Sequence, residues 1–153
     1  VVLTMAEKES IEIRLTSDPR WLQVLRAAVG QVGHLAGLDP ATVDHLKLAV
    51  DEACANIIVH GYGGERGQPI VATLHLFPDR LEVCLRDFGK KVAPESIRPK
   101  ELDASRPGGL GVRLIYCCMD EVTYQAADGP GMELRMVKYL RADRGGSGGS
   151  SHQ

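Results

Sequence analysis

Hydrophobic positions in this chain switch between a period of two residues, typical of strands, and a helical period near 3.6. Near the N-terminus, Ile11, Ile13 and Leu15 alternate with charged residues, which predicts a first strand. Asp18-Pro19 then marks a helix start, because aspartate caps helix N-termini and proline suits the first helical position. This helix is expected to stop near Gly37, and its apolar stripe consists of Trp21, Leu25, Ala28, Val32 and Leu35.

A second helix begins at Asp39-Pro40 and has two different faces. One face is an apolar stripe of Val43, Leu46, Val50, Ala53 and Ile57, and the other carries His45, Glu52, Asn56 and His60. Glu52 and Asn56 are four residues apart, so both side chains leave the helix in one direction. A carboxylate beside a neutral amide suits a base next to a hard cation such as Mg²⁺, which takes oxygen ligands. An ordinary amphipathic helix with a solvated polar face gives the same pattern. The helix is expected to end at Gly61 in the left-handed conformation.

The second half of the chain predicts two pairs of strands with a helix between them. A glycine-rich turn over residues 62–68 precedes the first pair, whose strands are joined by a tight Pro78-Asp79 turn. The predicted strands cover residues 69–77, 80–87, 121–125 and 132–139, and the predicted helix covers residues 109–119. Hairpins in sequence with helices between them predict an α+β fold, a two-layer α/β sandwich. Its sheet would be mixed and mostly antiparallel, with the helices on one face.

Asp87 stands at the end of a strand whose apolar row is Leu81, Val83 and Leu85. Because side chains alternate across a strand, Asp87 continues the row that points into the core. A buried carboxylate needs a hydrogen-bond donor, and the amino group of adenine is one such donor. Gly89, two residues later, lets the chain turn close to a ligand. An aspartate that merely begins a turn is the alternative.

The segment over residues 90–107 has little periodicity and contains three prolines. Irregular loops of this length are uncommon in compact domains and often act as lids. The loop leads into Gly108, Gly109 and Gly111, where glycines before a helix let backbone N–H groups approach phosphate. The segment lacks the Gly-Lys-Ser/Thr of a Walker motif, and it follows a loop rather than the strand of a dinucleotide fold. A plain glycine turn remains the alternative.

Composition narrows the class of protein. The chain of 153 residues is 44% hydrophobic, which fits one domain over residues 10–142 with an N-terminal extension over 1–9 and a flexible Gly/Ser tail over 143–153. A net charge of −2 argues against nucleic acid as the main partner, and no apolar run approaches membrane-spanning length. The four cysteines have no zinc spacing and are expected to be buried thiols in a reducing cytoplasm: Cys54, Cys84, Cys117 and Cys118.

A helical Glu-x-x-x-Asn, a strand-end Asp-x-Gly, a lid and a Gly-x-Gly at a helix start occur here in one order. In that order and spacing they resemble the histidine-kinase-like ATPase superfamily (Bergerat fold; GHKL ATPases), which includes gyrase, Hsp90, MutL and sensor kinases. The flanking sequence is closer still to the anti-sigma factor serine kinases of this superfamily. The resemblance covers roughly residues 10–140 and rests on residues 48–56 (LAVDEACAN), 60–62 (HGY), 108–115 (GGLGVRLI) and 119–122 (MDEV).

The resemblance implies a role for each matched residue at the base and adenine ends of the site. Glu52 would be the general base, and Asn56 would be a ligand of Mg²⁺. Asp87 would bind the adenine amino group of ATP, and Gly89 would shape that pocket.

At the phosphate end, the resemblance implies that Gly108, Gly109 and Gly111 line the phosphates and that Arg106 lies near them in the lid.

The chain also departs from the family pattern in two places. Lys91 stands where many members have a second glycine after Asp-x-Gly, and residues 131–134 (GMEL) replace the typical threonine near the adenine.

The resemblance further implies an ATP-dependent protein serine/threonine kinase that acts as an anti-sigma factor. It would phosphorylate an anti-sigma factor antagonist and sequester an RNA polymerase sigma factor, usually as a homodimer, with neither nucleic acid nor a membrane as its partner. A two-component histidine kinase is not expected, because no phosphoacceptor helix precedes the domain, and gyrase-like function would need a further domain. The alternative is a non-catalytic ATP-binding module that switches a partner. Glu52 favours the kinase, since a pure binder needs no base.

Overall fold

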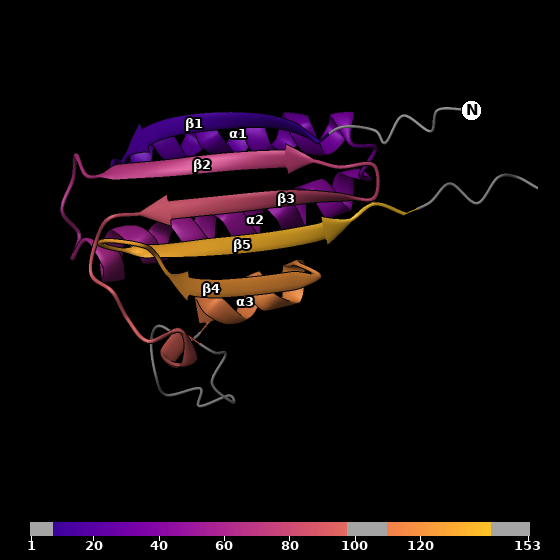
Figure 1. Ribbon diagram of the computed structural model, residues 1–153. Helices are drawn as coiled ribbons and strands as arrows, with labels where there is room; N and C mark the ends of the chain where they lie inside the picture. Colours follow the sequence, from indigo (N-terminus) through magenta and orange to yellow (C-terminus); the bar gives the residue numbers. More distant parts are fainter. Residues whose placement is uncertain (1–7, 98–109, 142–153) are drawn as a thin grey trace, which may run out of the picture.

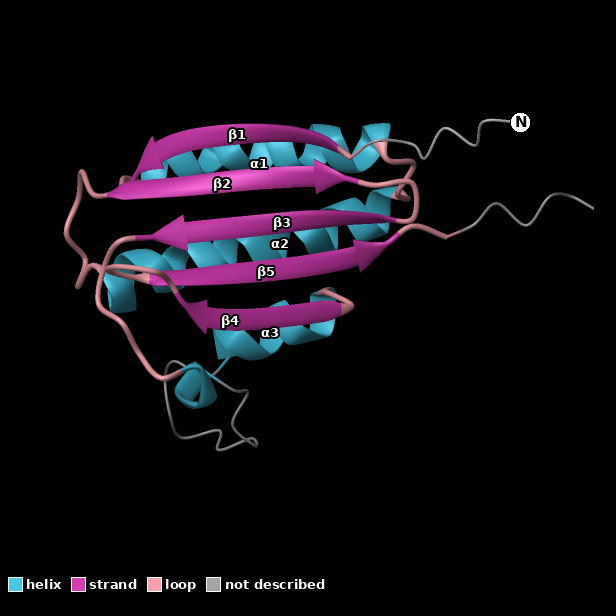
Figure 2. Ribbon diagram, viewed as in Figure 1, coloured by secondary structure: helices cyan, strands magenta, loops and turns pink. Residues whose placement is uncertain are grey.

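The computed structural model describes residues 8–97 and 110–141, and this part of the chain contains one five-stranded sheet. The strands are β1 (Glu9–Thr16), β2 (Pro69–Leu76), β3 (Arg80–Asp87), β4 (Glu121–Ala126) and β5 (Met132–Tyr139). They lie in the order β1-β2-β3-β5-β4, and every neighbouring pair is antiparallel. The helices α1 (Pro19–Leu35), α2 (Pro40–Asn56) and α3 (Leu110–Cys118) all lie behind one face of this sheet (Figures 1 and 2). The predicted two-layer α+β fold is confirmed.

Both long helices start as their sequences predict. The Asp18 side chain accepts a hydrogen bond from the Arg20 backbone N–H at 3.0 Å, and Asp39 accepts one from Thr42 at 2.7 Å. A proline occupies the first turn of each helix, where no backbone donor is needed. These caps fix where α2 begins and therefore which of its faces meets the sheet.

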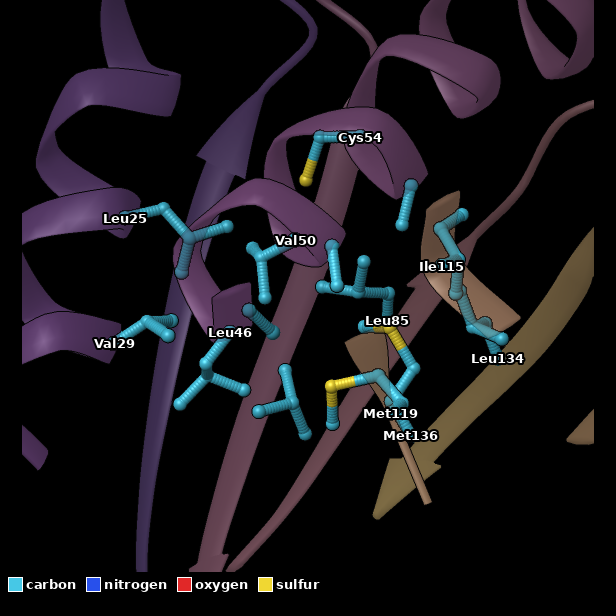
Figure 3. Packing of buried hydrophobic residues seen from close by; sticks show 14 of the residues in the cluster. Leu25, Val29, Leu46, Val50, Cys54, Leu85, Ile115, Met119, Leu134 and Met136 are labelled. Carbon is cyan, nitrogen blue, oxygen red and sulfur yellow. The ribbon is translucent and has the colours of Figure 1, made fainter. Parts of the chain in front are cut away.

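Helix α2 lies over the middle of the sheet and supplies much of the core. The apolar stripe predicted for it, Val43, Leu46, Val50, Ala53 and Ile57, is buried throughout. All of them except Val43 belong to one buried cluster with residues of the sheet that include Leu85 and Met136 (Figure 3). Each fully buried leucine or valine contributes roughly 1.5–3 kcal/mol. The packing therefore holds α2 firmly, with its polar face turned away from the core.

The stripe predicted for α1 is wrong at both ends. Leu25 is buried, but Trp21 is 48% exposed and Leu35 is 72% exposed. The buried face of α1 is instead centred on Leu25 and Val29. Two glycines on that face, Gly30 and Gly33, lie close to side chains of α2. Contact with α2 therefore sets the rotation of α1, and the outer ends of the predicted stripe face solvent.

The end of α2 also differs from the prediction. After Asn56 the helix continues as a π-helical turn, η1 (Ile57–Gly61), in which the Tyr62 N–H bonds to the Ile57 carbonyl at 3.0 Å. Gly61 is not in the left-handed region, and the nearest left-handed glycines are Gly63 and Gly64. The wider turn carries the chain past Gly61 before it reverses.

The cysteine prediction needs a correction as well. All four thiols are free, but only Cys54 and Cys118 are buried, while Cys84 is half-buried and Cys117 is exposed. Burial raises the pKa of the Cys54 thiol to about 12, so this thiol stays protonated at neutral pH. No helix within residues 8–97 and 110–141 has the length and apolar character needed to cross a bilayer.

Candidate active site

Glu52 and Asn56 lie on successive turns of α2, where this helix meets the start of α3. Gly111 of α3 lies close to both side chains. A β-carbon added to this glycine would be 2.6 Å from Glu52 Oε2 and 3.7 Å from Asn56 Oδ1. Both side chains are half-buried, and α2 and α3 lie side by side behind the sheet (Figure 1). The structure therefore brings Glu52, Asn56 and Gly111 together from two separate elements.

The Asn56 amide has an unmet hydrogen-bonding requirement. Its Nδ2 atom is buried and has no partner among the described residues. Leaving a buried polar group unpaired costs about 1–3 kcal/mol, so each such group calls for an explanation, and a bound ligand is one explanation for Asn56. An asparagine amide has both an acceptor oxygen and a donor NH₂ group, so Asn56 offers a ligand either an acceptor or a donor.

The start of α3 gives this corner of the molecule a positive electrostatic character. The first N–H groups of a helix have no partners within it, and the helix dipole places partial positive charge there. Because Gly111 has no side chain, the Glu52 carboxylate can lie against this backbone. An anionic ligand such as a phosphate would meet the helix end here with a carboxylate beside it.

Asp87 lies at the end of β3 and is buried, with 4% of its surface exposed. The row Leu81, Val83 and Leu85 is also buried, which confirms the predicted alternation. Asp87 Oδ1 accepts a hydrogen bond from the Gly89 backbone N–H at 3.0 Å. Burial raises the pKa of Asp87, while the backbone N–H groups of Gly89 and Met132 act in the opposite direction. A carboxylate can accept about four hydrogen bonds, so Asp87 keeps acceptor capacity for a ligand.

Two glycines allow three backbone segments to meet around Asp87. A β-carbon on Gly89 would stand 2.2 Å from the Gly61 carbonyl oxygen. A β-carbon on Gly131 would be 2.0 Å from the Asp87 carbonyl oxygen. Gly131 also has a φ of +89°, a backbone conformation that favours glycine. The sequence places Gly131 in the turn before the last strand and in the segment that replaces the typical threonine, and it predicts no role for Gly131 at the site. The Asp128-Gly129-Pro130-Gly131 run predicts a turn just before β5, but it does not predict that this turn approaches Asp87.

Comparison with known proteins decides the family. Residues 8–138 match the histidine kinase-like ATPase domain, a span that contains every element of this site. The chain belongs to the histidine kinase-like ATPase family. The resemblance drawn from the motifs is thereby confirmed, and membership of this family implies that ATP is the nucleotide bound.

Several relatives in this family carry the name serine-protein kinase RsbW. The protein from Halalkalibacterium halodurans is 30% identical, over 90% of this chain and 87% of its own length. The protein from Bacillus velezensis is 30% identical and that from Bacillus pumilus 31%, each over 88% of both chains. The similarity therefore extends over nearly nine-tenths of this chain and of each relative.

The chain after Asp87-Phe88-Gly89 turns without the second glycine that many family members have. Within the described ranges no residue other than glycine has a positive φ, so Lys91 adopts an ordinary backbone conformation. The neighbouring Lys90 N–H donates to the Gly61 carbonyl at 2.9 Å. This bond fixes the first residues after Asp-x-Gly without a glycine hinge.

The segment for which the sequence predicts phosphate contacts is described only in part. Gly111 is placed, whereas Arg106, Gly108 and Gly109 lie outside the described residues, and their roles stay predictions. Among residues 8–97 and 110–141, no group of three or more His, Cys, Asp or Glu side chains could hold a metal ion. Mg²⁺ characteristically completes its ligand shell with water and nucleotide phosphates, so the single oxygen of Asn56 fits an ion that arrives with ATP.

We expect Asp87→Asn to stabilise the protein while weakening ATP binding. Burial raises the folded-state pKa of Asp87, so stability falls as pH rises from the ordinary pKa of an aspartate through the folded-state pKa. This loss is fully present above the folded-state pKa, and a neutral amide removes it. Each kcal/mol gained would raise the melting temperature by about 2–4 °C. Adenine nucleotides should lose more affinity than guanine nucleotides, because the amide replaces one acceptor with a donor.

Thermal melts and calorimetric titrations with ATP and GTP check both effects. Asp79→Asn is the matched control, since Asp79 lies on the exposed β2–β3 turn. A variant at Asp87 that melts lower than the wild type and binds ATP equally well would contradict the assignment of this carboxylate.

Proposed function

We propose that this protein is an ATP-dependent protein serine/threonine kinase that acts as an anti-sigma factor. Its substrate would be a serine of an anti-sigma factor antagonist, and its second partner an RNA polymerase sigma factor. The observation that carries the proposal is the Glu52 carboxylate, held against the start of α3 with the unpartnered Asn56 amide beside it. The relatives named serine-protein kinase RsbW support the same reaction class. We further propose a cytoplasmic homodimer.

Each residue of the site has a task in this reaction. Bound Mg²⁺–ATP would supply the terminal phosphoryl group and the positive charge that neutralises the phosphates. Asp87 would accept a hydrogen bond from the adenine amino group and so orient the nucleotide. The N–H groups at the start of α3 would hold phosphate oxygens, and the Asn56 amide oxygen would ligate Mg²⁺. Glu52 Oε2 would accept the proton of the serine hydroxyl, which leaves the serine oxygen free to bond to phosphorus as ADP departs.

A transfer assay separates this kinase from an ATP-binding module without catalytic activity. The wild-type protein is mixed with ATP labelled on its terminal phosphate and with a candidate antagonist protein. The proposal predicts label on a serine of the antagonist, and none on an antagonist variant that lacks this serine. If ATP binds but no antagonist, tested together with its cognate sigma factor, acquires label, the non-catalytic module is the correct function.

Gly111→Ala is expected to slow phosphoryl transfer about ten- to hundredfold, because misplacing a catalytic group by about 1 Å has effects of that order. The added methyl group would stand 2.6 Å from Glu52 Oε2, so the carboxylate has to move, whereas no backbone clash arises. Alanine also favours a helix over glycine by about 1 kcal/mol, which offsets any packing cost. Single-turnover assays measure the expected loss of transfer rate, and thermal melts check that the stability of the variant changes little. A normal rate would show that Glu52 need not stay against Gly111.

A further inference from the structure

We infer that Tyr62 is a positioning residue of the adenine pocket, because its hydroxyl group joins the chain segments that hold Asp87. The inference rests on the proposed binding of adenine at Asp87. It concerns the loop after α2, the start of β2 seven residues later, and the loop after β3, 26 residues after Tyr62 along the chain.

The Tyr62 hydroxyl makes two hydrogen bonds to backbone groups. It accepts the Phe88 N–H at 2.8 Å and donates to the Pro69 carbonyl oxygen. Phe88 directly follows Asp87, and Pro69 is the first residue of β2. One side-chain oxygen therefore fixes the residue next to the adenine-binding carboxylate relative to a neighbouring strand.

The residue before Tyr62 strengthens the same connection. The Gly61 carbonyl accepts the Lys90 N–H at 2.9 Å, and the Gly61 backbone lies directly against Gly89. Residues 61 and 62 thus bind the chain on both sides of Gly89, whose own N–H donates to Asp87 Oδ1. The Asp87 carboxylate is held in place through this short network.

The π-helical turn at the end of α2 brings these groups to the pocket. Single π-turns inside helices are rare and often occur at functional sites. Here η1 carries α2 from Asn56 to Gly61 without a break, so one continuous element bears both Glu52 and the segment that orients Asp87. Burial and the Asp87 charge both raise the pKa of Tyr62, so its hydroxyl stays protonated and keeps donating at neutral pH.

Tyr62→Phe tests this role, since it removes the hydroxyl and keeps the ring. The dissociation constants of ATP and ADP should rise about five- to tenfold, by the same factor for both, because the change lies at the base end. The preference for ATP over GTP should fall by a similar factor. Transfer at saturating ATP should change less than about twofold, because Glu52 and Asn56 keep their places.

Hydrogen exchange without nucleotide provides a second readout of the same variant. The amide hydrogens of Phe88 and Lys90 should exchange about tenfold faster in Tyr62→Phe, while amides in the centre of β3 stay as protected as in the wild type. Tyr139→Phe is the matched control, because Tyr139 lies at the exposed end of β5 and its hydroxyl bonds to Glu121 of β4, away from the pocket. This control should alter neither nucleotide affinity nor exchange at Phe88.

The outcomes separate this inference from the proposed function. If the wild type binds ATP and Tyr62→Phe keeps its affinity, its preference over GTP and its Phe88 protection, the role of Tyr62 is overturned and the kinase proposal stands. If inorganic tripolyphosphate loses as much affinity as ATP, Tyr62 supports the fold in general, and the positioning role is equally wrong. A wild type that binds no ATP overturns the proposed function and the pocket with it.

Discussion

Glu52→Gln is expected to reduce phosphoryl transfer by about 10²–10⁴-fold, the usual contribution of a general base, while ATP affinity stays within a few-fold. Glutamine keeps the size of the side chain and its contact with Gly111 but cannot accept the serine proton as a carboxylate does. The effect should therefore appear in the rate of transfer at saturating ATP. Single-turnover transfer and calorimetric ATP titration measure the two quantities separately.

Asp51→Asn is the matched control for this variant. Asp51 is the adjacent residue on α2, but its carboxylate points to α1 and pairs with Arg26 at 2.7 Å. Loss of this partly exposed pair should cost at most about 1 kcal/mol of stability and leave transfer unchanged. Wild-type transfer by Glu52→Gln would show that this residue is not the base.

Gly131→Ala is expected to destabilise the protein by roughly 3 kcal/mol or more, a loss typical of substitutions that combine steric overlap with backbone strain. The new β-carbon would lie 2.0 Å from the Asp87 carbonyl oxygen, in backbone that cannot simply rotate away. Residue 131 also has a φ of +89°, which costs an L-residue about 1–2 kcal/mol by itself. Because Asp87 must shift, ATP affinity should fall as well.

Gly129→Ala separates the two causes. Gly129 lies in the same turn and has a φ of +87°, yet nothing stands within 4 Å of its β-carbon position. Its substitution should cost only the conformational term, about 1–2 kcal/mol, with ATP affinity unchanged. Chemical unfolding of both variants measures the difference. If both variants lost the same free energy of unfolding, the close approach of Gly131 to Asp87 would make no contribution to stability.

Much of this architecture follows from local rules that a sequence exposes. The burial of Asp87 follows from the alternation of side chains along β3, and the start of each long helix follows from an Asp-Pro pair. The approach of Glu52 and Asn56 to one point follows from their four-residue spacing. These features depend on neighbouring residues or on a single periodic face, so the pattern of the chain is sufficient to predict them.

The remaining features depend on contacts between distant segments. The rotation of α1, which leaves Trp21 exposed, is set by how closely Gly30 and Gly33 approach α2. The role of Gly131 appears only when the turn before β5 meets the end of β3. The two bonds of the Tyr62 hydroxyl join residues 7 and 26 positions away. Neither periodicity nor a local motif predicts such tertiary contacts, because only the fold brings the partner residues together.

A crystal structure of the protein with a non-hydrolysable ATP analogue and Mg²⁺ tests the proposed site most directly. We predict that the adenine amino group lies within hydrogen-bond distance of the Asp87 carboxylate, that the Asn56 amide oxygen ligates Mg²⁺, and that the terminal phosphate lies beside Glu52 and the start of α3. A nucleotide bound away from Asp87, or with its terminal phosphate remote from Glu52, would contradict both the nucleotide assignment and the proposed base.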